Sequence, residues 1–183
     1  MTHYIDIRLM PKTEIRENVL LNQVYTLFHK RLYDLKVTEI AVSFPEYSLK
    51  LGRLFRVHGT KEALGMLMGK EWLGEYARHC KVSEIMVVPD AVKYRTISRV
   101  QQNMTEAKLR RLIKRGTIKD EDVKKYRIKM FQGGLENPYV ELRSMSNGQM
   151  HRRFIEFGTL TETPVSGEFD LFGLSKTATV PWF

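Results

Sequence analysis

The sequence offers few side chains that could do chemistry, and histidine is the most useful of them. It has five histidines and one cysteine, Cys80, without a Cys-x-x-Cys or His-x-x-x-His spacing, so we expect no metal site and no cofactor. There is also no glycine-rich phosphate cradle. His29, beside Lys30 and Arg31 on a predicted helix, is the best candidate for proton transfer near neutral pH. The alternative is an ordinary surface histidine.

The positive charge of the chain is concentrated in one stretch. Residues 1–92 carry 13 lysines and arginines against 11 acidic residues, residues 93–119 carry 9 against 1, and residues 120–183 carry 8 against 9. Such a segment favours a polyanionic partner. Nucleic acid is a better candidate than an anionic membrane because no bulky apolar face accompanies the charge. The alternative is a solvated basic face.

RNA would bring its own nucleophile to a histidine. The 2′-hydroxyl attacks the neighbouring phosphorus, so a protein needs only to position it, accept its proton and stabilise the developing charge. A single histidine that titrates near neutrality is sufficient as the base. If the bound polyanion is cut, the composition therefore favours RNA cleavage without a metal ion.

The basic stretch predicts an extended segment followed by a helix. Thr105 is a plausible N-cap for a helix that ends near Arg115. One side of this helix carries cations that can follow a phosphate backbone, and the other side is expected to pack on protein. The basic residues are Lys108, Arg110, Arg111, Lys114 and Arg115, and the apolar ones are Leu109, Leu112 and Ile113. Upstream, Arg99 and Gln101 point the same way and could read guanine and adenine edges, or be ordinary exposed polar residues.

Elements of the order β-α-β-β-α-β are predicted in the first half of the chain. Alternation over residues 3–9 turns Ile5, Ile7 and Leu9 inward, and a three- and four-residue period predicts a helix from about residue 14 to residue 35. Strands at 39–44, 53–58 and 83–88 and a helix at 61–68, which 72–79 could continue, complete the pattern. We predict an α+β protein whose residues 1–92 form a ferredoxin-like (RRM-like) domain carrying His29.

The second half, residues 93–183, is predicted to be an α+β RNA-binding domain built around the arginine-rich helix. A weaker helical or irregular segment follows at 120–129, and two strands at 139–146 and 149–157 are joined by the Asn147-Gly148 turn. We expect the active site at the junction of the two halves. The sequence has no apolar run long enough to span a bilayer. We therefore expect no association with a membrane and a cytoplasmic location.

Short motifs are spread over the whole chain. They are HYIDIRL at 3–9, VSFP at 42–45, VVP at 87–89, YR at 94–95, SRVQ at 98–101, LRSMSNGQ at 142–149, GLSK at 173–176 and VPWF at 180–183, with His29 and the basic helix. Each motif is weakly specific, but their order and spacing together are highly specific. Together they resemble the repeat-processing endoribonuclease of type I-F CRISPR systems.

The resemblance implies a metal-independent mechanism with two catalytic residues. His29 would be the general base, and Ser144 would hold the ribose for in-line attack. The products would be a 2′,3′-cyclic phosphate and a 5′-hydroxyl. The resemblance further implies RNA contacts by the base-reading and groove-binding residues Arg99, Gln101, Lys108, Arg111 and Arg115, and by Ser146 and Asn147 near the scissile phosphate.

Two positions depart from the family pattern. Phe172 stands where the family has an active-site tyrosine, so a ring could pack under the nucleotide but no phenolic hydroxyl can donate a proton. His151 replaces the aromatic residue that stacks on the last base pair, and an imidazole stacks more weakly.

The implied partners are the CRISPR precursor RNA hairpin, the mature CRISPR RNA that stays bound after cleavage, and the other subunits of the type I-F interference complex. One alternative is a catalytically inactive subunit that only holds the hairpin. A general basic RNA chaperone would explain the basic helix but neither His29 with Ser144 nor the segment at 180–183.

Overall fold

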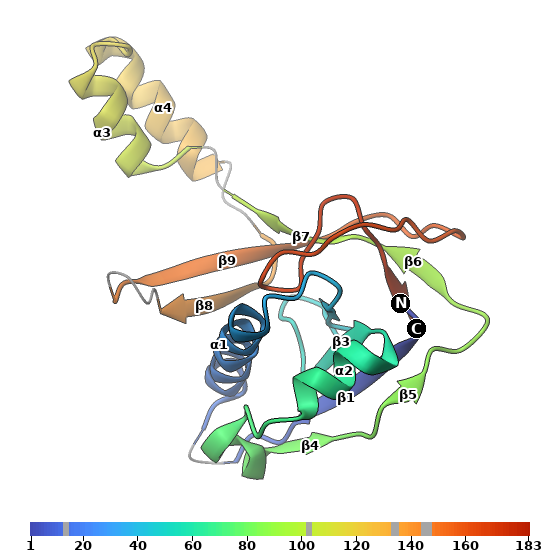
Figure 1. Cartoon of the computed structure of the whole chain (residues 1–183). Helices are drawn as coiled ribbons and strands as arrows, with labels where there is room; N and C mark the ends of the chain where they lie inside the picture. The colour runs from blue at the N-terminus through green and yellow to red at the C-terminus, as the bar shows by residue number, and fades with distance from the viewer. Residues whose placement is uncertain (13–14, 102–103, 133–135, 144–147) are drawn as a thin grey trace.

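The computed structural model describes residues 1–12, 15–101, 104–132, 136–143 and 148–183. These residues form an α+β protein in which a helical hairpin stands away from a body made of sheets and helices (Figure 1). The predicted class is confirmed.

The first sheet is built around β1 (His3–Leu9), which pairs with antiparallel neighbours on both edges. β3 (Leu54–Gly59) lies on one edge, with β2 (Ala41–Ser43) beyond it. β4 (Cys80–Val82) and β5 (Met86–Val87) share the other edge, so the strand order is β2-β3-β1-β4. α1 (Glu17–Leu35) and α2 (Lys61–Met68) contact each other and pack on this sheet.

The alternation of β1 divides the sheet into two different faces. Ile5 and Ile7 are fully buried in the core that the helices cover, and Leu9 is nearly so, as predicted. On the opposite face, Asp6 pairs with Arg56 of β3 at 2.6 Å, and the Arg56 guanidinium also donates to the Phe183 carbonyl oxygen at 2.7 Å. The C-terminal residue therefore lies against part of the second face, where Arg8 stays exposed.

The predicted strand at 83–88 is wrong in its bounds, because two short strands replace it. The Ser83 hydroxyl accepts a hydrogen bond from the Asp6 amide at 2.9 Å and donates to the Glu84 carbonyl, which interrupts regular pairing between β4 and β5. Ahead of β4, residues Gly74–His79 form a 3₁₀ helix rather than a continuation of α2.

The remaining strands form two smaller sheets. β6 (Lys93–Arg95) pairs with β10 (Val180–Trp182). β7 (Ile97–Val100), β9 (Met150–Phe157) and β8 (Tyr139–Arg143) form an antiparallel sheet of order β7-β9-β8. β8 lies beside α1, where the Asn22 side-chain oxygen accepts the Glu141 amide hydrogen at 3.0 Å. Buried residues of these strands join the same apolar core as the first sheet.

The projecting hairpin consists of α3 (Glu106–Lys114) and α4 (Asp120–Gln132). The Thr105 hydroxyl accepts the Lys108 amide hydrogen at 3.1 Å, so the predicted N-cap is confirmed. Leu109 is fully buried, but Ile113 is 43% exposed, so its predicted packing is wrong. The physical reason is that α3 packs mainly on α4, and among the described residues this contact leaves the Ile113 side chain partly uncovered.

Replacing Arg56 with alanine is expected to lower the free energy of unfolding by about 2 to 4 kcal/mol, because it leaves Asp6 without its buried partner. The side chains of Arg56 and Asp6 are only 8% and 23% exposed. The matched control is Arg53→Ala, whose pair with Glu17 is 57% and 30% exposed and is worth at most about 1 kcal/mol. Urea unfolding measures the free energy of unfolding of both variants. Equal decreases would contradict the role of the Arg56–Asp6 pair as the more stabilising of the two.

Candidate active site

α1 carries two side chains that hold the turn at residues 170–174. The Tyr25 hydroxyl donates to the Phe172 carbonyl oxygen at 2.9 Å. The His29 ring nitrogen Nδ1 lies 2.7 Å from the Leu171 carbonyl oxygen. Tyr25 and His29 are four residues apart and therefore lie on one face of the helix. The turn is thus bound to α1 at two consecutive carbonyl groups.

The turn has its shape because Asp170 and Gly173 organise it locally. One carboxylate oxygen of Asp170 accepts the amide hydrogens of Phe172 and Leu174 at 2.9 and 3.0 Å. Gly173 has a φ of +71°, which favours glycine, and its carbonyl accepts the Val42 amide hydrogen at 3.0 Å. These contacts attach the turn to β2 and direct the Leu171 carbonyl toward His29.

The contact with Leu171 determines which nitrogen of His29 can act as a base. A backbone carbonyl can only accept a hydrogen bond, so Nδ1 carries the hydrogen in the neutral ring. The lone pair is then on Nε2. His29 is half-buried, and its ring stacks on Phe172 with a centroid distance of 3.6 Å and an interplanar angle of 11°. The ring is therefore held in one orientation with Nε2 as the basic atom.

The pKa of His29 is lowered from its ordinary value of 6.5. Burial is the main cause, because it disfavours the charged form. The hydrogen bond to Leu171 acts against burial and raises the pKa, the nearby positive charge of Arg153 lowers it, and the negative charge of Asp170 raises it. The net effect keeps the imidazole neutral at pH 7, as a general base requires.

Arg153 of β9 lies on the other side of the Phe172 ring. Its guanidinium carbon is 3.4 Å from the ring centroid. Two groups this close to one centroid cannot share a face of the ring, so His29 and Arg153 cover opposite faces. Phe172 is therefore enclosed between an imidazole and a guanidinium.

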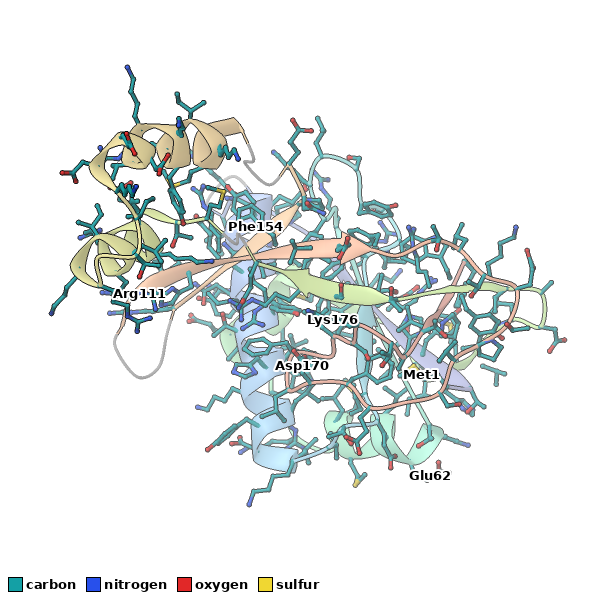
Figure 2. The ribbon with its side chains drawn as sticks, turned by 90° about the horizontal axis from the view of Figure 1, so that it is seen from above. Met1, Glu62, Arg111, Phe154, Asp170 and Lys176 are labelled. Atoms are coloured by element: carbon teal, nitrogen blue, oxygen red, sulfur yellow. The ribbon has the colours of Figure 1, made fainter. Side chains whose placement is uncertain are left out.

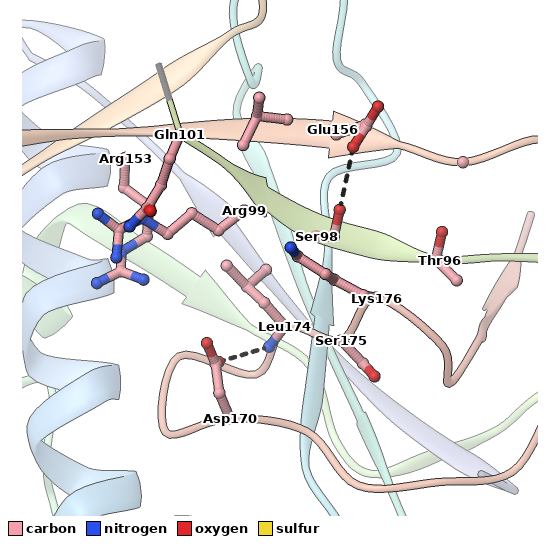
Figure 3. A pocket seen from close by; sticks show the side chains of 12 residues that line it. Thr96, Ser98, Arg99, Gln101, Arg153, Glu156, Asp170, Leu174, Ser175 and Lys176 are labelled. Atoms are coloured by element: carbon pink, nitrogen blue, oxygen red, sulfur yellow. Dashed lines mark hydrogen bonds between the residues drawn. The ribbon is translucent and has the colours of Figure 1, made fainter. Parts of the chain in front are cut away.

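A cavity of about 790 Å³ opens on the Arg153 side of this stack. Figure 3 shows Arg99, Gln101 and Arg153 converging at one end of it, with Asp170 and Lys176 along its wall. The Gln101 amide is oriented so that its oxygen faces hydrogen-bond donors. This oxygen accepts hydrogen bonds from the two terminal nitrogens of Arg99 at 3.0 and 3.2 Å. The predicted base-reading pair thus lies in a basic hollow beside the histidine stack.

The structure brings some of the predicted site residues together and separates others. His29 and Phe172 are in contact, and Arg99 and Gln101 line the adjoining cavity. Lys108, Arg111 and Arg115 are exposed on the projecting hairpin, where Figure 2 shows Arg111, and His151 is exposed on β9 opposite Leu142. The predictions for Ser144, Ser146 and Asn147 fall outside the described residues, directly after β8.

Three residues of this site were not predicted from the sequence. Tyr25 was signalled only by its spacing of four residues from His29, and Asp170 only as an acidic residue before Phe172 and Gly173. Arg153 is one of two adjacent arginines, and strand alternation predicts that they face opposite ways without saying which faces the site. Their roles depend on contacts between distant segments.

The part of the chain that the structure describes has no group of three or more histidine, cysteine, aspartate or glutamate side chains placed to hold a metal ion. Within the same residues, no helix is long and apolar enough to cross a membrane.

Fold and site define a small α+β protein with a basic helical hairpin and a half-buried histidine oriented as a base. Residues 4–183 match the family described as CRISPR-associated protein (Cas_Csy4). The chain is 33% identical over 184 residues to the CRISPR-associated endonuclease Cas6/Csy4 of Escherichia coli (strain UTI89 / UPEC). It is 37% identical over 187 residues to the CRISPR-associated endonuclease Cas6/Csy4 of Pseudomonas aeruginosa (strain UCBPP-PA14). Both alignments cover 100% of each chain. The protein belongs to the Cas_Csy4 family, and the resemblance indicated by its motifs is confirmed.

Gly173→Ala is expected to destabilise the protein more than Gly74→Ala. Both glycines have positive φ, +71° and +52°, so each alanine incurs a left-handed strain of about 1 to 2 kcal/mol. At Gly173 the new Cβ would lie 3.1 Å from the Val42 backbone nitrogen, whereas nothing lies within 4 Å of a Cβ at Gly74. Urea unfolding of both variants checks this difference. If Gly173→Ala lowers the free energy of unfolding no more than Gly74→Ala does, the close approach of the turn to β2 is contradicted.

Proposed function

We propose that this protein is an endoribonuclease that cleaves CRISPR repeat RNA at the 3′ base of a stem-loop. Its family and the names of its relatives support an endonuclease that acts in a CRISPR system. The observation that carries the chemistry is the hydrogen bond between His29 Nδ1 and the Leu171 carbonyl, because it leaves Nε2 free to accept a proton.

In the proposed reaction, His29 removes the proton of a 2′-hydroxyl. The 2′-oxygen attacks the adjacent phosphorus and the bond to the 5′-oxygen breaks. The leaving 5′-oxygen takes a proton from protonated His29 or from water, so the products are a 2′,3′-cyclic phosphate and a 5′-hydroxyl. Since the nucleophile is part of the substrate and the base is a neutral imidazole, the step needs no metal ion or cofactor. Ser144 would hold the ribose of the attacking nucleotide.

The proposed RNA path runs from the cavity to the projecting hairpin. Arg99 and Gln101 would read base edges at the foot of the stem, where an RNA groove is open to side chains. The exposed cations Lys108, Arg111 and Arg115 of α3 would follow the phosphates of the stem. Ser146 and Asn147 would contact RNA near the cut, and His151 would stack on the last base pair. Both faces of Phe172 are covered, so this ring would support His29 and meet a nucleotide only at its edge.

We also propose two units with the boundary near residue 92. Residues 1–92 would form a ferredoxin-like domain, which the antiparallel order β2-β3-β1-β4 with two helices supports. Residues 93–183 would form the RNA-binding unit. His29 comes from the first and the turn at 170–174 from the second, so cleavage would need both.

The mature CRISPR RNA is proposed to stay bound after cleavage. The scissile phosphate is a small part of the contacted surface, and cutting it removes little affinity. The protein would then hold the hairpin in the cytoplasm as one member of the type I-F interference complex. A second candidate function is an inactive hairpin-holding subunit. The observation that favours it is Phe172, whose ring has no hydroxyl to protonate the leaving oxygen.

Cleavage is expected to slow as the pH falls, with the midpoint of this acid limb below pH 6.5. Protonated His29 has no lone pair on Nε2, and its lowered pKa shifts this loss to lower pH. Single-turnover rates with saturating protein, measured between about pH 5 and pH 8, check this profile. A rate that rises toward low pH would contradict a histidine base.

His29→Ala is expected to reduce cleavage of a labelled cognate repeat hairpin by at least about 100-fold in excess EDTA, while the hairpin still binds tightly. The matched control is His3→Ala, which removes a histidine at the start of β1. Gel separation of the products measures cleavage, and filter binding measures affinity. If EDTA abolishes cleavage by the wild type, the metal-free mechanism is contradicted. If the wild type and His29→Ala both bind tightly and neither cleaves, the protein is the hairpin-holding subunit.

A further inference from the structure

Two adjacent arginines of β9 have different surroundings. Arg152 is exposed and forms a salt bridge with Glu141 of β8 at 2.9 Å. Arg153 points to the other face of the strand, is half-buried, and lies over Phe172 at the wall of the cavity. Successive side chains of a strand point to opposite faces, so the pair offers the same charge in two environments.

Arg153 is a cation without an anionic partner among the described residues. Within this part of the chain its side chain forms no salt bridge or hydrogen bond, and its buried Nε has no acceptor. The Phe172 ring contacts the guanidinium but cannot accept its five directed hydrogens. Partly buried N–H donors without acceptors are energetically unfavourable. The Arg153 guanidinium is therefore suited to bind a ligand group with several acceptor oxygens.

The neighbours of Arg153 do not supply these oxygens. The Oδ1 atom of Asp170 is committed to the amides of Phe172 and Leu174, and Asp170 forms no salt bridge with Arg153. Arg99 adds a second positive charge at the same end of the cavity (Figure 3). Burial is the main cause that lowers the pKa of Arg153; the charges of Tyr25 and Asp170 raise it and the charge of Arg99 lowers it, and the arginine remains charged. The cavity therefore presents two guanidinium groups to a ligand.

We propose that Arg153 binds the non-bridging oxygens of the scissile phosphate, across the Phe172 ring from His29. This inference rests on the proposed function, because it assigns a further residue to the same cleavage site. Guanidinium groups bind phosphate through two parallel hydrogen bonds, which suits the planar fork of Arg153.

The position fits the separation of the reacting groups. In RNA the 2′-oxygen and the neighbouring phosphate belong to one nucleotide linkage, and His29 and Arg153 are separated by one aromatic ring. As His29 takes the 2′-proton and the bond from the 2′-oxygen to phosphorus forms, negative charge grows on the non-bridging oxygens. Arg153 would donate hydrogen bonds to them and keep all its protons while the bond to the 5′-oxygen breaks.

The first test uses binding alone, so it does not depend on cleavage. The probes are two synthetic repeat hairpins that end at the cut, one with a 3′-phosphate and one with a 3′-hydroxyl. The wild type is expected to bind the 3′-phosphate hairpin about tenfold more tightly than the 3′-hydroxyl hairpin. This ratio corresponds to the binding energy of a hydrogen-bonded charge pair. Arg153→Leu should abolish this preference. Arg152→Leu, which removes the same charge from the opposite face, should retain it.

The second test separates catalysis from folding. With saturating protein, Arg153→Leu is expected to slow single-turnover cleavage by about tenfold or more, and Arg153→Lys by less, because lysine keeps the charge but loses the fork. The acid limb of the pH profile should also move to higher pH in Arg153→Leu, because His29 then faces Asp170 without Arg153. Urea unfolding identifies any variant that fails to fold, in which case Arg153→Lys carries the test.

An unchanged phosphate preference in Arg153→Leu, or no preference in the wild type, would overturn the assignment even if the wild type cleaves RNA. Failure of the wild type to cleave, with the phosphate preference present and lost in Arg153→Leu, would overturn the proposed activity but support Arg153 as the ligand of the phosphate at this position. The two hypotheses therefore fail on different measurements.

Discussion

The site depends on one contact, in which a face of α1 binds two consecutive carbonyl groups of the turn at 170–174. Tyr25 and His29 come from the first quarter of the chain, and the turn comes from its last fifteen residues. This contact orients the histidine, places Phe172 against it and holds Asp170 and Leu174 at the wall of the basic cavity. Without it, His29 would be a helix residue with no defined tautomer and no neighbour to stack on.

The electrostatic arrangement follows from that contact. His29 is half-buried near a fixed positive charge, so its pKa is lowered and its neutral form is favoured at pH 7. Phe172 separates the imidazole from the guanidinium of Arg153, which lets a base and a cation lie near one another without a direct contact between them. An apolar ring thus keeps two polar functions apart within one small site.

Local patterns in the sequence predicted local structure well. The alternation of β1 and the cap at Thr105 were both confirmed, because each depends on neighbouring residues. The strand at 83–88 was wrong because a side chain interrupts the pairing, and Ile113 was wrong because amphipathic periodicity does not say whether a partner surface exists. For the site, residue types and family motifs indicated His29, Arg99 and Gln101. Arg153 and Asp170 could not be predicted, since their positions follow from long-range packing.

The projecting hairpin of α3 and α4 has a consequence for how this protein can change over evolution. The hairpin packs mainly on itself, so its cations can be exchanged or its helices lengthened with little effect on the buried core around β1. Under the proposed function, affinity for the phosphates of a stem could then be changed without altering the histidine stack. Backbone affinity and chemistry would thus be separable traits, whereas base reading by Arg99 and Gln101 stays next to the stack.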